Sequence, residues 1–213
     1  PETGESWKTR LRTPSSTSEV EICRREDGRT EVLLTLPPAV FEAAVVSAVG
    51  LAQILSVSQE SFRDDLDMTV TTTDFRSLLV PIRNISDLEA AKPDFAALTD
   101  WCRHESLDTV FLFSPVNETF AGGLRVREFC PAIGSPESAA SGTTNRAVSC
   151  YLYQTHHLGD MQNGDIVVQS EQGNELGRPS LITSRLSICD GQVATVYVGG
   201  VATKTIEGSF LFS

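Results

Sequence analysis

The chain has little that would bind it to nucleic acid or place it in a membrane. It has no run of Lys or Arg, and its net charge of −11 would repel nucleic acid phosphates. No segment offers the roughly 18 continuous apolar residues of a membrane span. Residues 1–10, PETGESWKTR, contain no apolar signal-peptide core. We therefore expect a cytoplasmic protein that binds neither nucleic acid nor membrane.

The chain also lacks a pattern that would predict a metal site or a disulfide framework. Its five cysteines are scattered without a C-x-x-C pair, so free thiols in a reducing compartment are predicted. They are Cys23, Cys102, Cys130, Cys150 and Cys189. His156 and His157 are adjacent, and adjacent side chains point apart instead of sharing a metal. We expect no metal and no cofactor.

One stretch, Arg127 to Gln154, carries most of the information. A loop punctuated by Pro and Gly leads into the small-residue turn 141–144, Ser-Gly-Thr-Thr, and apolar residues then recur at helical spacing. This predicts a central helix at about 141–155. Ser and Thr can cap such a helix, and its free N–H groups and positive dipole end form a site for a carboxylate. A capped, buried helix without a ligand is the alternative.

Three motifs in order resemble the PhzF-like family of phenazine biosynthesis proteins. The R-x-F-x-P loop is residues 127–131, and the motif close to E-D-P-A-T-G-S-A is residues 137–144, ESAASGTT. Residues 172–180, QGNELGRPS, are similar to Q-G-x-x-x-G-R-P-S, and Val198-Gly199-Gly200 with Gly208 follows near the end. The resemblance is strongest over residues 120–210.

The resemblance implies an α+β fold like that of diaminopimelate epimerase. In that fold each of two halves is a curved mixed sheet, or barrel, wrapped around a central helix, with the active site between the halves. Residues 41–213 would be a complete second half, and residues 1–40 a strand hairpin that remains from the first half.

Periodicity supplies further elements. Strands are predicted at 20–24 and 31–36, joined by the turn Asp27-Gly28, and residues 1–18 are interpreted as a loop. A helix is predicted from Phe41 to Leu55. Strands are expected at 165–170, 180–189, 193–200 and 204–212, separated by turn residues.

The resemblance further implies a cofactor-independent isomerase or epimerase that moves a proton on a small carboxylate-containing metabolite. Ser138, Ser141, Gly142, Thr143 and Thr144 would bind the substrate. Arg127, Gly177 and Arg178 would have structural roles near the site, with the Arg178 guanidinium holding its loop.

Two departures leave the catalytic residue unassigned. Ser138 stands where the family motif usually carries Asp, and the family's acid/base Glu with its G-H-A-T motif has no counterpart here. Glu137 and Ser141 are the candidates that remain. Glu137 could equally hold the loop, and Ser141 could be a cap or a substrate ligand. Cys130 and Cys150 are interpreted as packing residues.

Two hypotheses follow. In the first, the chain is an isomerase whose missing half comes from an absent N-terminal segment or from another chain. In the second, it is a degenerate member that binds a ligand or a partner without turnover. Either way we expect association, as a homo-oligomer such as a dimer or with the missing segment.

Overall fold

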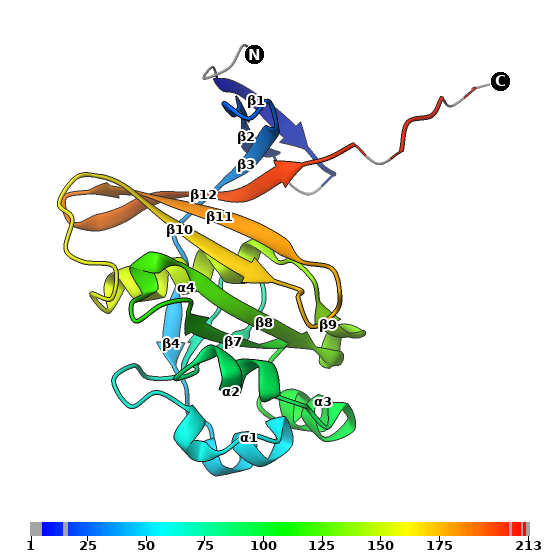
Figure 1. Cartoon of the computed structure of the whole chain (residues 1–213), viewed down its shortest axis with the longest axis vertical. Coiled ribbons are helices and arrows are strands. Elements are labelled where there is room, and N and C mark those ends of the chain that lie inside the picture. The colour runs from blue at the N-terminus through cyan, green and yellow to red at the C-terminus, as the bar shows by residue number, and fades with distance from the viewer. Residues whose placement is uncertain (1–5, 15–16, 205, 210, 212–213) are drawn as a thin grey trace.

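A computed structural model describes residues 6–14, 17–204, 206–209 and 211 (Figure 1). In this part of the chain, the strands form one mixed sheet in the order β1-β2-β3-β12-β11-β10-β8-β7-β6-β5-β4, with β9 paired to β8. The pairs β6–β7 and β8–β10 are parallel, and the other pairs are antiparallel. The strands are β1 Ser6–Arg12, β2 Thr17–Arg24, β3 Thr30–Leu36, β4 Phe41–Ala43, β5 Thr69–Thr71, β6 Ser77–Pro81, β7 Thr109–Pro115, β8 Leu124–Cys130, β9 Ser135–Ser138, β10 Gly164–Gln172, β11 Ser180–Cys189 and β12 Gln192–Ala202.

The helices divide between the inside and the outside of this sheet. The α-helices are α1 Ala48–Leu55, α2 Ile85–Ala90, α3 Phe95–His104 and α4 Gly142–Gln154, and the short 3-10 turns are η1 Gln59–Ser61, η2 Phe120–Gly122 and η3 Pro131–Ile133. Helix α4 fills the hollow of the curved sheet, while α1–α3 pack on the outside of β5–β8. The predicted α+β class, with a curved sheet around a central helix, is confirmed.

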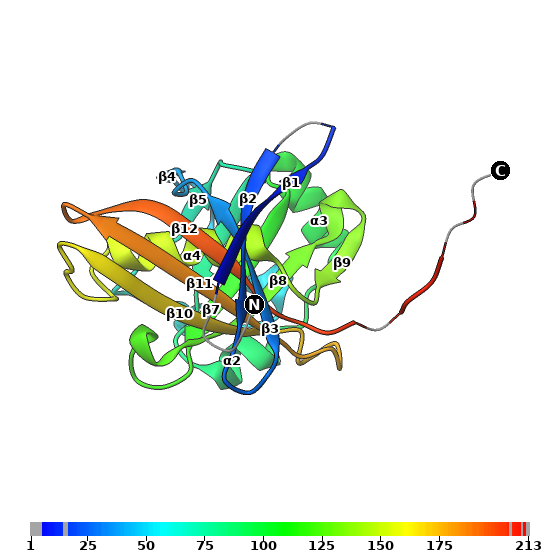
Figure 2. The same cartoon turned by 90° about the horizontal axis from the view of Figure 1, so that it is seen from above.

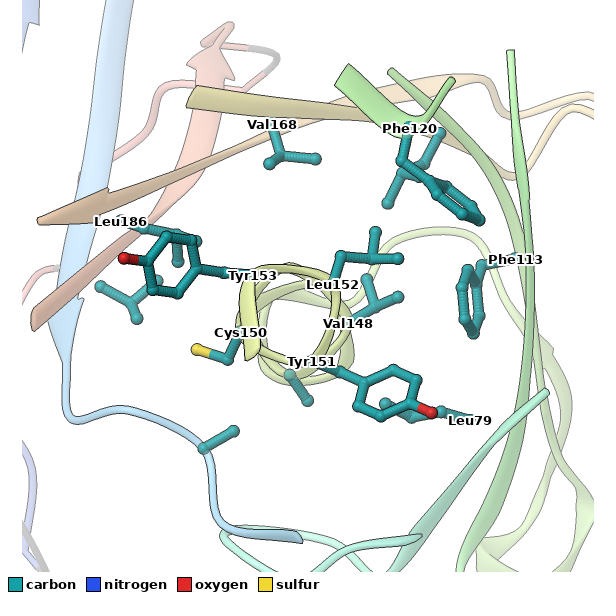
Figure 3. Close-up of a cluster of buried hydrophobic side chains, with 14 of the residues drawn as sticks. Leu79, Phe113, Phe120, Val148, Cys150, Tyr151, Leu152, Tyr153, Val168 and Leu186 are labelled. Atoms are coloured by element: carbon teal, nitrogen blue, oxygen red, sulfur yellow. The ribbon is translucent and has the colours of Figure 1, made fainter. Parts of the chain in front are cut away.

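The sheet covers α4 all the way round. Every residue from Thr144 to Tyr153 is buried. Figure 3 shows the side chains of Tyr151, Leu152 and Tyr153 pointing in different directions from the helix, toward partners on different strands. A helix buried on every side is the core element of its barrel.

The strands beside α4 divide their side chains between two cores. On β6 and β7, Leu79, Phe111 and Phe113 contact the α4 side, while Val110 and Leu112 face α1–α3. Because both faces are covered, these strands have continuous apolar runs instead of an alternating pattern.

Strands β1–β3 form a ribbon at the end of the molecule opposite α1–α3 (Figure 1) and cross over the strands around α4 when seen from above (Figure 2). The predicted hairpin of β2 and β3 is present, with Gly28 at φ +79° in its turn. Strand β1 was not predicted. All of its residues are exposed, and it forms through pairing with β2.

Two other sequence predictions need correction. The helix predicted from Phe41 begins only at Ala48, because Phe41–Ala43 pairs with β5 as a strand. The strand predicted at 204–212 is absent from its described residues, since β12 ends at Ala202. The other three C-terminal strands and the central helix lie within a few residues of their predicted bounds.

Candidate functional site

The first turn of α4 is open. Ser141 is the N-cap residue, but its side chain makes no capping hydrogen bond. Its Oγ instead accepts a hydrogen bond from Thr144 Oγ1 at 2.7 Å and lies 3.3 Å from Thr143 Oγ1. Within the described residues the backbone N–H groups of Gly142, Thr143 and Thr144 donate no hydrogen bond, and Gly142 is exposed. The side-chain cap that Ser141 could have supplied, which the alternative of a capped helix without a ligand assumed, is therefore absent, and donors remain for a ligand.

Gln172 holds the segment that leads into this turn. Its Oε1 accepts from the Ser141 N–H at 3.2 Å and from Asn145 Nδ2 at 2.9 Å. Its Nε2 donates to the Ser138 carbonyl at 2.9 Å. Two of these bonds connect β10 to the loop and the third connects it to α4, so the position of the turn depends on a residue about thirty places away along the chain. Gln172 opens the third motif but had no predicted role.

Glu128 is a second residue that sequence reasoning missed. It lies on β8, and its side chain is among the hydroxyl groups of Ser141, Thr144, Thr109 and Ser138. The residue is 4% exposed, and no cation of the described chain forms an ion pair with it. Burial raises the pKa of Glu128 by more than the hydroxyl groups lower it. The sequence did contain a sign of this burial: Glu128 follows Leu124 and Val126 at alternate positions of the strand, so all three side chains lie on the same face of the sheet.

Glu137 has a structural partner that occupies both of its oxygens. Arg127 Nε lies 2.9 Å from Oε1, and Arg127 Nη2 lies 3.0 Å from Oε2. Arg127 Nη1 also donates to the carbonyls of Ala91 and Leu88 at the end of α2, and its guanidinium lies over the ring of Phe129. This geometry favours the loop-holding interpretation of Glu137 over a role as a base.

The loop of the third motif is held by its backbone. Gly173 has φ +82°, and a Cβ there would lie 2.5 Å from the Arg178 carbonyl and 2.7 Å from the Ala139 carbonyl. The Arg178 N–H donates to the Gly173 carbonyl, and Gly177 has φ +65°. Arg178 is exposed, and within the described residues its guanidinium makes no hydrogen bond. The fork of donors predicted to fix this loop does not do so.

The predicted site residues fall into two neighbouring groups. Glu137, Ser138 and Arg178 line a cavity of about 580 Å³ that also contacts Cys130. Burial, and secondarily the charge of Glu128, raises the pKa of the Cys130 thiol, consistent with a packing role. Residues 141–144 form the turn itself, where a Cβ on Gly142 would lie 3.6 Å from Val198 of β12. Cavities of about 850 and 710 Å³ lie elsewhere, near Tyr151 and Tyr153 toward the C-terminal end of α4.

The described residues contain no group of three or more His, Cys, Asp and Glu side chains placed to hold a metal ion. None of their helices is both long and apolar enough to cross a membrane.

Comparison with known proteins places the chain in a family. The PhzC-PhzF family, described as phenazine biosynthesis-like protein, matches residues 2–208, so the chain belongs to it. The chain is 27% identical over 161 residues to an uncharacterized isomerase of Deinococcus radiodurans, covering 74% of this chain and 50% of that protein. It is 31% identical over 136 residues to the trans-2,3-dihydro-3-hydroxyanthranilate isomerase of Pseudomonas aeruginosa, covering 62% and 44%.

Solved structures of the family share the fold. A PhzF-family protein of Bacillus anthracis superimposes with a TM-score of 0.74 at 16% identity, covering 91% of this chain and 64% of that one. A Pseudomonas aeruginosa protein described as a predicted epimerase gives 0.71 at 21% identity, covering 100% and 69%. The chain spans about half the length of the first curated relatives it matches.

Proposed function

We propose that this chain forms part of an isomerase or epimerase that transfers a proton on a small carboxylate-containing metabolite without a cofactor. The names of the relatives support an isomerase or epimerase. The observation that carries the proposal is the open first turn of α4, where Gly142 is exposed and three successive N–H groups have no acceptor among the described residues.

The turn suits the chemistry of such a reaction. A carboxylate bound to the N–H groups of Gly142 and Thr143 would lie at the positive end of the α4 dipole. Removal of a proton from the carbon beside that carboxylate puts negative charge on its oxygens. The same N–H groups would stabilise that charge more strongly than the substrate's own charge. Ser141 and Thr143 add hydroxyl donors within the same turn.

The division into halves belongs to the same proposal. Residues 1–40 would belong to the first half of the enzyme and residues 41–213 to the second. On the ribbon, the exposed fractions of Trp7 and Leu11 are 57% and 52%. Both residues lie on the face of the sheet that continues through Ile22 and Val32 toward the α4 core. An exposed apolar face of this kind favours association, either with the remainder of a first half or with a second copy. A cytoplasmic, dimeric, biosynthetic enzyme is the form that the resemblance implies.

A specific observation favours the alternative, a binding protein without turnover. Both oxygens of Glu137 contact Arg127, and Ser138 replaces an acid of the family motif. No ionised carboxylate of the motif is then free to act as a base at the turn.

The two functions are separated by incubating the protein in D₂O with trans-2,3-dihydro-3-hydroxyanthranilate, the substrate named for the Pseudomonas aeruginosa relative. Deuterium at ring carbons of the recovered compound, seen by mass spectrometry, would support the isomerase. Binding without deuterium would support the alternative. Gly142→Ala is the matched variant, because its added methyl fits beside Val198 yet narrows access to the N–H groups. This variant should reduce both the deuterium incorporation and the binding of the compound, without changing the melting temperature of the protein.

A further inference from the structure

Glu128 occupies an unusual place in the barrel. It is a carboxyl group at 4% exposure beside the first turn of α4, without an ion-pair partner among the described cations. An isolated buried carboxylate is strongly disfavoured unless it is paired, well hydrogen-bonded or protonated. The hydrogen bonds that the neighbouring hydroxyl groups make bear on whether Glu128 is well hydrogen-bonded as an anion or protonated.

Each neighbouring hydroxyl has only one proton to donate. Thr109 Oγ1 donates to Ser77 Oγ at 2.7 Å, and Ser138 Oγ donates to the Ala140 carbonyl at 3.0 Å. Thr144 Oγ1 donates to Ser141 Oγ at 2.7 Å. These bonds compete with the hydrogen bonds that the four hydroxyl groups give Glu128, and the latter lower its pKa by less than burial raises it. Burial without an ion pair to a described cation therefore favours the protonated form of Glu128 relative to that of an exposed glutamate.

The same contacts connect Glu128 to the open turn. The carboxyl group of Glu128 is hydrogen-bonded by Thr144 and Ser141. Thr144 Oγ1 also donates to Ser141 Oγ, which lies next to Thr143 Oγ1. This hydrogen-bonded chain joins a buried acid to the place where a ligand carboxylate would bind.

We propose that Glu128 is the proton-holding group of this site, and that a carboxylate binds at the α4 turn only while Glu128 is protonated. The inference rests on the proposed function. An ionised Glu128 would place a second negative charge behind the N–H groups and would cancel the attraction of the helix end. Glu128 is therefore a positioning residue that acts through Thr144 and Ser141, and not one that contacts the ligand.

Few other titratable groups face Glu128. Thr109 of β7, Ser138 of β9 and residues 141 and 144 of α4 do not titrate near neutral pH. Cys130 follows on β8, and its pKa is raised. Of the nearby charged groups, Glu137 is paired with Arg127, and Arg146 of α4 is paired with Asp74. The pH dependence of carboxylate binding is thus expected to come from Glu128. Cys130 is the other titratable group whose contribution a control variant must exclude.

Calorimetric titration with benzoate tests the inference over about pH 5 to 9, where benzoate stays ionised. Benzamide serves as the uncharged probe. For the unmodified protein, benzoate affinity should fall by up to about tenfold per pH unit once Glu128 ionises, because one proton is linked to binding. Glu128→Gln should bind benzoate with an affinity that is independent of pH. Two control variants should keep the fall: Cys130→Ala, and Glu21→Gln at the pair of Glu21 on β2 with Arg185 on β11.

The outcomes are distinguishable. A pH dependence that persists in Glu128→Gln overturns the inference and leaves the proposed carboxylate site intact. Absence of benzoate binding to both proteins at every pH overturns the proposed site and the inference with it. If Glu128→Gln does not fold, ¹³C NMR of the carboxyl groups in glutamate-labelled protein replaces it. One glutamate should then titrate above the others and shift further upward with bound benzoate, and the lack of such a resonance refutes the linkage.

Discussion

The pair of Arg127 and Glu137 gives the sharpest prediction for the stability of the site. Their side chains are 7% and 6% exposed, and two hydrogen bonds of 2.9 and 3.0 Å join them. Arg127→Met removes the cation but fills much of the same space. It leaves the Glu137 carboxylate buried without a partner and removes the donor to the Ala91 and Leu88 carbonyls of α2. We expect a loss of about 3–5 kcal/mol in the free energy of unfolding.

The double variant sharpens the test. Arg127→Met with Glu137→Met removes both charges, so no unpaired buried ion remains, and it should be more stable than Arg127→Met alone. Urea unfolding followed by circular dichroism measures all the free energies at a single pH. A loss below about 1 kcal/mol for Arg127→Met would refute the reasoning, because that is the size expected of a solvated surface pair. It would also return Glu137 to the candidates for the catalytic base.

Three other predictions concern single positions. Burial raises the pKa of Glu128 above its unfolded value of 4.5, so the native state keeps this proton to higher pH and the stability of the fold falls as pH rises. Glu128→Gln should remove about 1.4 kcal/mol of that fall for each unit by which the pKa is raised. Melting temperatures measured from acid to alkaline pH test this. Gly173→Ala should lower the free energy of unfolding in urea by more than about 2 kcal/mol, because the added methyl group meets two carbonyls. Gly177→Ala, where no atom lies within 4 Å of the added methyl group, should lower it by only about 1 kcal/mol, and equal losses would contradict this reasoning. Trp7→Glu should abolish self-association in light scattering without lowering the melting temperature, and an unchanged mass would argue against the ribbon as the contact.

The sequence predicted α4 to within a residue at each end, because its start and its apolar spacing are local signals. It did not predict burial on every side. Asn145 and Arg146 are polar and would ordinarily mark a solvent face, yet they are 0% and 1% exposed. Asn145 bonds to Gln172, and Arg146 pairs with Asp74. Both partners are distant in the sequence, so no helical pattern could indicate them.

The missed strands have the same cause. Strand β1 carries Lys8, Arg10 and Arg12 and resembles a polar loop, but its backbone pairs with β2 along its whole length. Residues Phe41–Ala43 fit a helical apolar pattern, yet β5 pairs with them from almost thirty residues further on. Pairing across such distances overrides local preference. The open turn was predicted in position but not in its lack of a cap, which depends on where the Ser141 side chain points.

Position 138 shows how the structure changes a conclusion drawn from a motif. Taken alone, Ser138 in place of the family's Asp implies that a carboxyl group has been lost from the site. In the structure, Glu128 lies directly across from Ser138 in the β8–β9 pair, and facing side chains of an antiparallel pair lie on the same side about 5 Å apart. A carboxyl group is therefore present, but it has moved from the half-buried edge strand into the barrel. There burial raises its pKa, which favours its protonated form over that of an exposed carboxyl group. Glu137, tied to Arg127, has no such freedom, and any proton that this chain contributes to a reaction is better held by Glu128.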